Sequence, residues 1–288
     1  MNPWPIGHKL IYVAGLPVAS TPFGAHARPE AFGDWADFLL TGDEAAAVAS
    51  LQRRRLRWVV VDGDLPPIGS AIVARGETPR DYYGKRLDLA GGVEIEPRPP
   101  LLRSLYFRLT RWIGSAATLA GGSEREEEIP ALEHFRLLLD SADDASRESI
   151  KAFELVPGAE LGISGPPGAP LALEYAFTSD TGRDRVYRRT VTLDAGGRAQ
   201  VRVPYSSARP DLGQVSAWRL TGLGIDQRIP VSERAVRRGE RIAVTAAPAG
   251  VGDRAGENGH RAGENGHRAG ENGDGAGENG HRAGDVAG

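Results

Sequence analysis

The chain has 288 residues, of which 40% are apolar, with no cysteine and a formal net charge of −3 at pH 7. This apolar fraction is enough to bury an ordinary core. The lack of cysteine excludes a disulfide scaffold, a thiolate zinc site and cysteine catalysis. No apolar run reaches the ~20 residues that a membrane-spanning helix needs.

The C-terminal segment differs in composition from the rest of the chain. Residues 254–288 consist of five tandem seven-residue units related to Arg-Ala-Gly-Glu-Asn-Gly-His. They carry no apolar stripe, so we expect residues 247–288 to form a disordered tail. Outside Val251–Gly288, Lys and Arg are as numerous as Asp and Glu. This balance argues against nucleic acid as a partner and against a basic membrane-docking surface.

Residues 1–145 alternate between helical and strand-like patterns. A short apolar helix is expected from Gly7 to Ala14, and a strand over Pro17–Ser20. Pro29 favours a helix start, and the apolar spacing that follows predicts a helix over Glu30–Leu40. Asp43 is expected to cap a second helix that runs to about Arg55.

The remainder of this region supplies further elements. The run Trp58–Val61 is typical of a central strand covered on both faces. Leucines spaced by four predict one amphipathic helix over Arg98–Ile113. The charge run Ser123–Glu128 indicates a solvated loop, and Leu132–Leu139 a returning strand. Together these elements predict a mixed α/β domain over residues 1–145.

The pattern changes to period two beyond the polar stretch Ser141–Ser149. Apolar residues alternate with polar ones around Leu171–Phe177, Tyr187–Leu193 and Ala199–Val203. Turn clusters rich in glycine and proline separate these runs at near-regular spacing. The prediction is a small antiparallel β-sandwich over residues 151–246, so the fold class is mixed α+β with a C-terminal tail.

Few residues point to chemistry. The three histidines before the tail, His8, His26 and His134, have no second ligand at metal-binding spacing, and a structural role is expected for His134. Asp62 and Asp64 follow a strand and could hold a divalent cation against a nucleotide sugar. The alternative for this pair is a strand-terminating turn, because only about sixty residues precede it and Pro66-Pro67 follows it.

The order of segments resembles the soluble C-terminal region of the oligosaccharyltransferase catalytic subunit of archaea and some bacteria. The matching segments are Trp4–Lys9, Ile11–Tyr12, Leu16–Ala19, Thr21–Gly24, Arg57–Asp62, Ser104–Leu109, His134–Leu137, Phe153–Gly158, Tyr187–Thr190 and Asp194–Tyr205. The first of these corresponds to the WWDYG motif of that family. Of that motif and its following histidine only Trp4, Gly7 and His8 are kept, and Pro5 stands in place of the aspartate.

The resemblance implies an extracytoplasmic, non-catalytic part of an enzyme of protein N-glycosylation. Trp4, Gly7 and His8 would contact the acceptor polypeptide. The catalytic residues and a divalent metal would belong to a membrane glycosyltransferase domain, which would also hold the lipid-linked glycan, so no cofactor is expected in this chain. Two alternatives remain open. One is a stand-alone exported module that binds carbohydrate or protein, with a signal-like segment at Leu10–Ser20, and the other is the transferase at Asp62 and Asp64.

Overall fold

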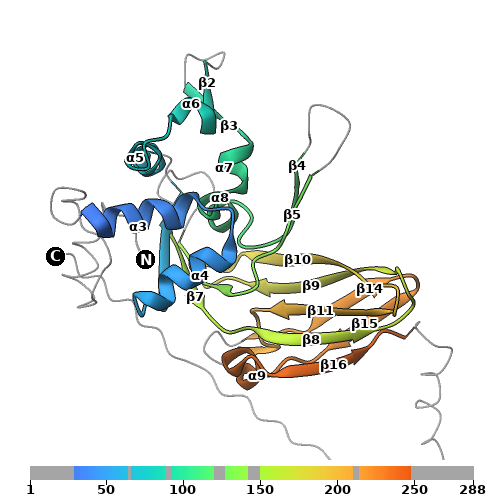
Figure 1. The fold of residues 1–288 in the computed structure, drawn as a ribbon. Helices are drawn as coiled ribbons and strands as arrows, with labels where there is room; N and C mark the ends of the chain where they lie inside the picture. The colour runs from blue at the N-terminus through green and yellow to red at the C-terminus, as the bar shows by residue number, and fades with distance from the viewer. Residues whose placement is uncertain are drawn as a thin grey trace, which may run out of the picture. The chain divides into compact units, whose positions relative to one another are not determined.

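The structure is a computed structural model that describes residues 29–63, 66–87, 93–119, 127–141, 150–209 and 214–247 (Figure 1). All of them belong to one compact unit, Met1–Ala249. The expected helix at Gly7–Ala14, the strand at Pro17–Ser20 and the tail lie outside the described residues. Within the described part, helices and several small sheets form a mixed α+β fold, which confirms the predicted fold class.

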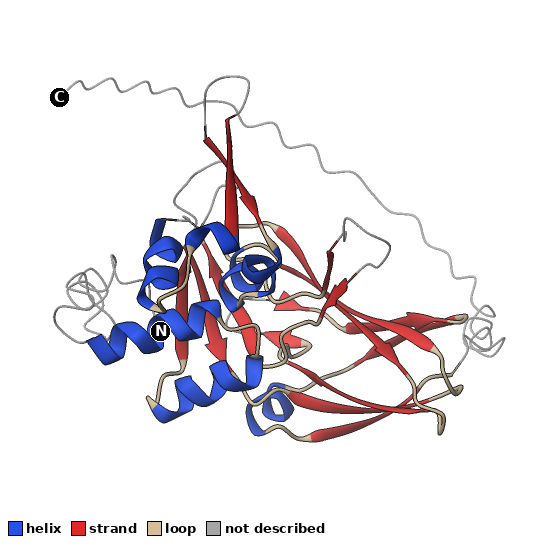
Figure 2. Cartoon of the chain, turned by 45° about the horizontal axis from the view of Figure 1, so that its top comes forward, coloured by secondary structure: helices blue, strands red, loops and turns tan. Residues whose placement is uncertain are grey.

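The first part of the chain, here called the helical region (residues 29–155), gathers its helices beside a three-stranded sheet (Figure 2). The helices are α3 (Pro29–Leu40), α4 (Glu44–Arg53), α5 (Pro66–Ala74), α6 (Pro79–Tyr82), α7 (Pro99–Arg103) and α8 (Leu105–Thr110). The sheet consists of β1 (Trp58–Asp62), β6 (Phe135–Asp140) and β7 (Ile150–Leu155). Two hairpins, β2 (Tyr83–Leu87) with β3 (Val93–Pro97) and β4 (Ala117–Leu119) with β5 (Glu127–Ile129), complete the region.

Helix boundaries follow local side-chain chemistry. Asp43 is the N-cap of α4, and its carboxylate accepts hydrogen bonds from the backbone N–H groups of Ala45 and Ala46, as predicted. The single helix expected over Arg98–Ile113 is wrong, because the chain forms α7 and α8 instead. At Ser104 the backbone is extended, and the Ser104 side chain caps α8 by accepting from the N–H of Phe107.

The charge run is a loop over only part of its length. Its last two residues, Glu127 and Glu128, lie in β5 and pair with Leu119 and Thr118 of β4. The expectation of a loop over the whole of Ser123–Glu128 is therefore wrong at its C-terminal end.

The three-stranded sheet has the order β1-β7-β6, and both pairings are antiparallel. Among the described strands β7 is therefore central and β1 lies at the edge. The expectation that Trp58–Val61 is covered on both faces is wrong, since Trp58 is 45% exposed. The alternate residues Val59 and Val61 are buried and share one core with the helices.

The second part of the chain, the sandwich (residues 156–247), contains two facing sheets. One has the order β10-β9-β14-β15 and the other β11-β8-β16. The bounds are β8 (Ala159–Ser164), β9 (Pro170–Thr178), β10 (Asp184–Thr192), β11 (Arg198–Val203), β14 (Trp218–Gly222), β15 (Ile225–Ile229) and β16 (Arg241–Thr245). The short strands β12 (Ala208–Arg209) and β13 (Gln214–Val215) and helix α9 (Glu233–Arg238) lie between them in the chain. β16 pairs parallel with β8, the one parallel pairing among the described strands.

The period-two pattern correctly identifies the inner faces of the sandwich. Leu171, Leu173 and Tyr175 of β9 are buried in one core with residues of every other long strand. Three of the four predicted turn clusters contain turns, and all four contain a glycine with positive φ: Gly158, Gly168, Gly182 and Gly197. At Gly158 a Cβ would lie 2.8 Å from the carbonyl oxygen of Glu133, so only glycine permits this approach.

Candidate functional site

The residues singled out from the sequence are only partly described. Trp4, Gly7 and His8 lie outside the described residues, as does Asp64. Asp62 ends β1, is half-buried and stands opposite Ile150 of β7. Among the residues that the structure describes, no group of three or more His, Asp or Glu side chains could hold a metal ion.

His134 lies just before β6 and takes part in local structure. Its ring Nδ1 is 3.0 Å from the carbonyl oxygen of Val156, and its backbone N–H donates to the carboxylate of Glu44. The first contact ties the residue before β6 to the start of the sandwich, and the second ties it to α4. They agree with the structural role expected for this histidine.

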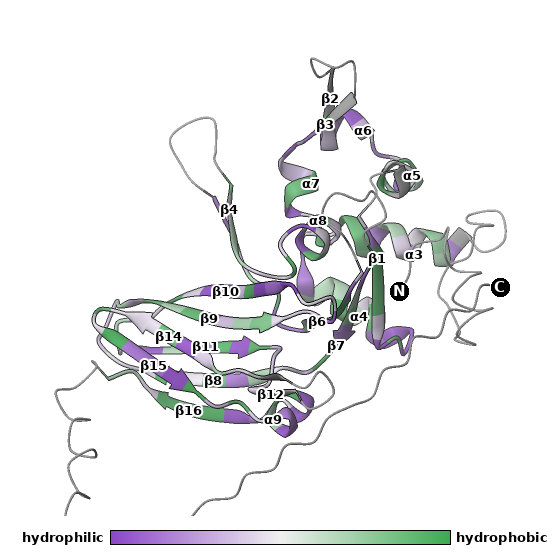
Figure 3. Ribbon diagram, turned by 180° about the vertical axis from the view of Figure 1, so that it is seen from behind, coloured by the Kyte–Doolittle hydropathy of each residue, from purple (hydrophilic) through white to green (hydrophobic). Residues whose placement is uncertain are grey.

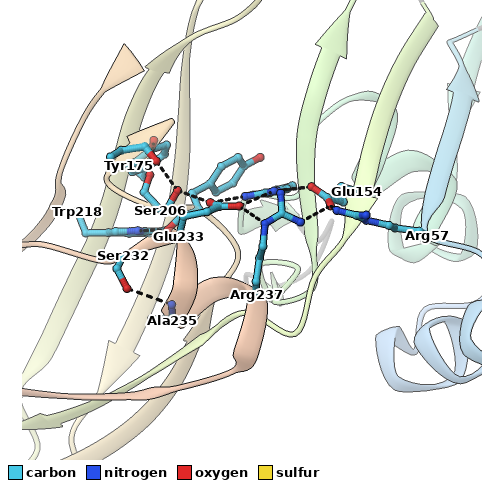
Figure 4. Close-up of polar contacts among 12 residues, drawn as sticks. Arg57, Glu154, Tyr175, Ser206, Trp218, Ser232, Glu233, Ala235 and Arg237 are labelled. Atoms are coloured by element: carbon cyan, nitrogen blue, oxygen red, sulfur yellow. Dashed lines mark hydrogen bonds and ion pairs between the residues drawn. The ribbon is translucent and has the colours of Figure 1, made fainter. Parts of the chain in front are cut away.

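A buried cluster of charges joins the helical region to the sandwich (Figure 4). We call it the junction cluster; it consists of Arg57, Arg136, Glu154, Glu233 and Arg237. Glu154 lies on the central strand β7 and Arg136 faces it from β6, and both side chains are almost fully buried. Glu233 and Arg237 come from α9 of the sandwich, one helical turn apart.

Both oxygens of each carboxylate in the junction cluster accept hydrogen bonds. One Glu154 oxygen accepts from Arg57 Nε at 2.7 Å and from Arg237 at 3.2 Å, and the other accepts from Arg136 Nε at 2.7 Å. Glu233 receives both terminal nitrogens of Arg136, at 2.8 and 2.9 Å. Arg136 is thus held by two carboxylates from different parts of the chain, a strong charge-assisted arrangement.

The protonation of the cluster follows from these contacts. Burial by itself would raise the pKa of Glu154, but the hydrogen bonds and positive charge of Arg136 and Arg57 outweigh it and hold the pKa below its ordinary value. Burial likewise opposes ionisation of Glu233, whereas Arg136 and the hydroxyl of Ser206 lower its pKa on balance. Both carboxylates are therefore ionised at neutral pH.

Buried hydroxyl groups make further links across the same junction. The backbone N–H of Leu137 in β6 donates to the phenol oxygen of Tyr205 at 2.9 Å. The hydroxyl of Tyr187 in β10 donates to the carbonyl oxygen of Leu132 at 2.7 Å. A second ion pair, between buried Asp140 of β6 and Arg185 of β10, lies at 2.6 Å. The two parts are therefore fixed to each other by directional bonds.

Glu44 provides a contrasting carboxylate within the helical region. It accepts from the backbone N–H groups of Glu133 (2.8 and 3.0 Å) and His134 (2.8 Å), and no arginine donates to it in the described contacts. Burial raises its pKa, and these two hydrogen bonds only partly offset the effect.

A cavity of about 610 Å³ opens among helices of the helical region. Its apolar lining includes Phe38, Leu40 and Ala47, and its charged lining includes Asp37 and Arg53. Tyr82 also lines it, and burial together with a hydrogen bond to Glu77 raises the pKa of Tyr82 to about 12. The volume is in the range of small-molecule sites.

The described contacts of the junction cluster are ion pairs and hydrogen bonds between two parts of the chain. The hydroxyl of Ser206, next to the junction cluster, donates to Glu233 at 2.7 Å. No helix of the described part is long and apolar enough to cross a membrane. The arrangement links one part of the chain to the other.

Sequence reasoning missed the junction cluster. The only sign of the cluster in the sequence is that Arg136 and Glu154 occur within strands that are otherwise mostly apolar and buried. A charged residue in such a run requires a buried partner. The partner cannot be named from one sequence, because Glu233 is 97 residues from Arg136.

One family model matches part of the chain. Residues 158–242 match the sequence model of the family described as the archaeal glycosylation protein B long peripheral domain. A comparison with curated proteins finds no match.

Solved structures of the Archaeoglobus fulgidus oligosaccharyltransferase share the fold. One, in complex with an inhibitory peptide and a dolichol-phosphate, is 15% identical with a TM-score of 0.64 and covers 84% of this chain and 37% of its own. Another, in complex with Zn and sulfate, is 15% identical with a TM-score of 0.63 and covers 84% and 40%. This chain thus spans about two fifths of the length of the structures that it matches.

Proposed function

We propose that the chain is the extracytoplasmic part of an oligosaccharyltransferase-like enzyme of protein N-glycosylation, because residues 158–242 match an archaeal peripheral-domain model and the fold is shared with an archaeal oligosaccharyltransferase. One observation carries the proposal. The family match lies in the sandwich, while the shared fold extends over 84% of the chain and therefore includes the helical region.

The proposed role is to support transfer without performing it. The membrane glycosyltransferase domain would supply the catalytic groups, the divalent metal and the lipid-linked glycan, on the extracytoplasmic face of the membrane. The related structures support the choice of ligands, since one of them contains an inhibitory peptide with a dolichol-phosphate and another contains Zn. The rigid junction fits this role, because a scaffold that positions an acceptor must hold its shape.

Contact with the acceptor polypeptide would fall to Trp4, Gly7 and His8. Pro5 replaces the aspartate of the WWDYG motif, so the side chain that would accept a hydrogen bond from a Ser or Thr hydroxyl is missing. We therefore propose that Trp4 and His8 contact the acceptor through packing and imidazole hydrogen bonding. Trp4→Ala should lower glycan occupancy, and Trp112→Phe, a conservative change in the helical region, serves as the control.

Depletion of the chain in its source cells tests the function directly. Mass spectrometry of surface glycoproteins should show a loss of N-glycan occupancy, restored by the wild-type chain. The purified chain alone should transfer no glycan. Unchanged occupancy after depletion would remove the proposal.

A further inference from the structure

The cavity of about 610 Å³ among the helices, here called the helix cavity, has no part in the proposed function. It is lined by residues of α3, α4 and α7, together with Arg75 after α5 and Tyr82 of α6. On α4 the lining includes Ala46, Ala49 and Ser50, which share one helix face because they are three and four residues apart. Their small side chains leave the space between the helices open.

A buried hydroxyl group in the wall of the helix cavity has no partner. Ser50 is 8% exposed, and its hydroxyl makes no hydrogen bond in the described contacts. Buried polar groups in proteins are nearly always hydrogen-bonded, so an exception of this kind indicates a partner from outside the chain. The hydroxyl can both donate to and accept from a molecule in the cavity.

Arg53 supplies an unbalanced positive charge at the same cavity. It lies in the last turn of α4 and lines the space, and no carboxylate pairs with it in the described contacts. Arg54, in contrast, donates to Asp34 at 2.6 Å. Arg103 donates to Glu127 at 2.7 Å. The guanidinium of Arg53 therefore keeps its donors for a ligand, and its planar fork fits a carboxylate.

Asp37 supplies the opposite charge. Its side chain lines the cavity from α3, is 69% exposed and lies 3.4 Å from Arg75. The same guanidinium lies 3.0 Å from Glu77. One arginine thus balances two carboxylates, which leaves an excess negative charge beside it. Figure 3 shows hydrophilic residues between hydrophobic ones along α3.

The two unbalanced charges lie several ångströms apart. The ion pair of Asp34 with Arg54 places the end of α4 beside Asp34. Asp37 is three residues further along α3, or roughly 5 Å at the rise of an α-helix. A ligand that meets both Arg53 and Asp37 must therefore hold its carboxylate and its ammonium group at a similar separation. The two residues of an extended dipeptide span up to about 7 Å, whereas a single amino acid carries both groups on one carbon atom.

We propose that the helix cavity binds a small zwitterion of the dipeptide class, with the carboxylate on Arg53 and the ammonium group on Asp37. The hydroxyl of Ser50 completes the polar contacts. Phe38 and Leu40 belong to the apolar lining and receive an aliphatic side chain. This site goes beyond the proposed function and does not depend on it, since it concerns binding and not glycan transfer.

Binding of glycyl-leucine to the purified full chain, followed by NMR, tests the proposal. Two derivatives of similar size each lack one charge: glycyl-leucinamide has no carboxylate, and N-acetyl-glycyl-leucine has no ammonium group. Glycyl-leucine should bind at least tenfold more tightly than either, with the largest changes at the backbone N–H groups of Ala49 and Ser50. Arg53→Gln should remove the preference over the amide, and Asp37→Asn the preference over the acetyl derivative. Arg198→Gln, at an exposed arginine of the sandwich, is the control and should change neither preference.

The outcomes distinguish a ligand site from a hollow filled by solvent. Equal affinity for the three compounds, no saturable change at Ser50 at millimolar concentrations, or preferences that survive both substitutions would overturn the proposal. A further variant, Ala49→Leu, fills the cavity from a half-buried position and should weaken the binding of glycyl-leucine at least tenfold. Undiminished binding to this variant would place the ligand elsewhere and overturn the proposal as well. Circular dichroism and thermal unfolding show that each variant is folded.

Discussion

The sandwich and the helical region cover their sheets in different ways. Both sheets of the sandwich turn their inner faces to one core, in which the rings of Tyr175, Tyr205 and Trp218 lie within 6.5 Å of one another. The sheet of the helical region packs helices on one face and leaves Trp58 and Leu139 exposed on the other. Apart from Ala131 of the helical region, the buried residues of the sandwich core come from the sandwich itself. The sheet of the helical region, in contrast, shares the charges of the junction cluster with the sandwich.

The largest expected effect is the loss of stability on substitution of Glu154, whose carboxylate accepts hydrogen bonds from both parts of the chain. In Glu154→Gln the neutral amide no longer balances buried Arg136. Breaking a buried ion pair on one side typically costs about 3–5 kcal/mol. Urea unfolding should show that the free energy of unfolding falls by this amount. The helical region and the sandwich should then unfold in separate transitions.

The control for this variant is Glu174→Gln, in an exposed pair with Arg188 on the surface of the sandwich. It should change the free energy of unfolding by at most about 1 kcal/mol. Equal losses in the two variants would mean that the junction cluster contributes no more than a surface pair.

A smaller loss is expected for Tyr205→Phe. The change removes the phenol oxygen that accepts from the N–H of Leu137 at a buried position, and the loss of such a bond costs about 1–3 kcal/mol. Hydrogen exchange should show faster opening of β6 than of β9. Tyr83→Phe is the matched control, because no described contact hydrogen-bonds the Tyr83 hydroxyl. Unchanged protection of β6 would show that the bond is dispensable.

The junction cluster should also set the response to acid. The pKa values of Glu154 and Glu233 are lower in the folded chain than the ordinary glutamate value of about 4.3. Their contribution to stability is fully present above that value and is lost as the pH falls through the lower folded pKa values. The free energy of unfolding should therefore fall steeply between pH 6 and pH 3. The slope should be shallower in Glu154→Gln, and an unchanged slope would assign acid sensitivity to other carboxylates.

The same contrast explains how much the sequence can predict. In the sandwich, alternation and turn glycines identify the buried residues and the turns, because each strand has one face in the core. In the helical region, the apolar run at Trp58–Val61 suggests cover on both faces, yet Trp58 is exposed. The break at Ser104 is a local cap that the leucine spacing conceals, whereas the pairing of Arg136 with Glu233 is a contact between residues 97 positions apart that no local pattern can predict.

The smallest effect, and the opposite sign, is expected for Glu44→Gln. Burial raises the pKa of Glu44 in the folded chain, so ionisation of this carboxyl group lowers the stability of the fold. The favourable contribution of the protonated form is present below the ordinary glutamate pKa and is lost as the pH rises through the higher folded value. A glutamine keeps an oxygen to accept from the N–H groups of Glu133 and His134 and carries no charge. Relative to the wild type, Glu44→Gln should therefore gain stability as the pH rises from 4 to 8, whereas Glu154→Gln should lose it over the same range. Loss of stability in both variants would show that the N–H groups of Glu133 and His134 require a full negative charge, and that the two carboxylates have the same role.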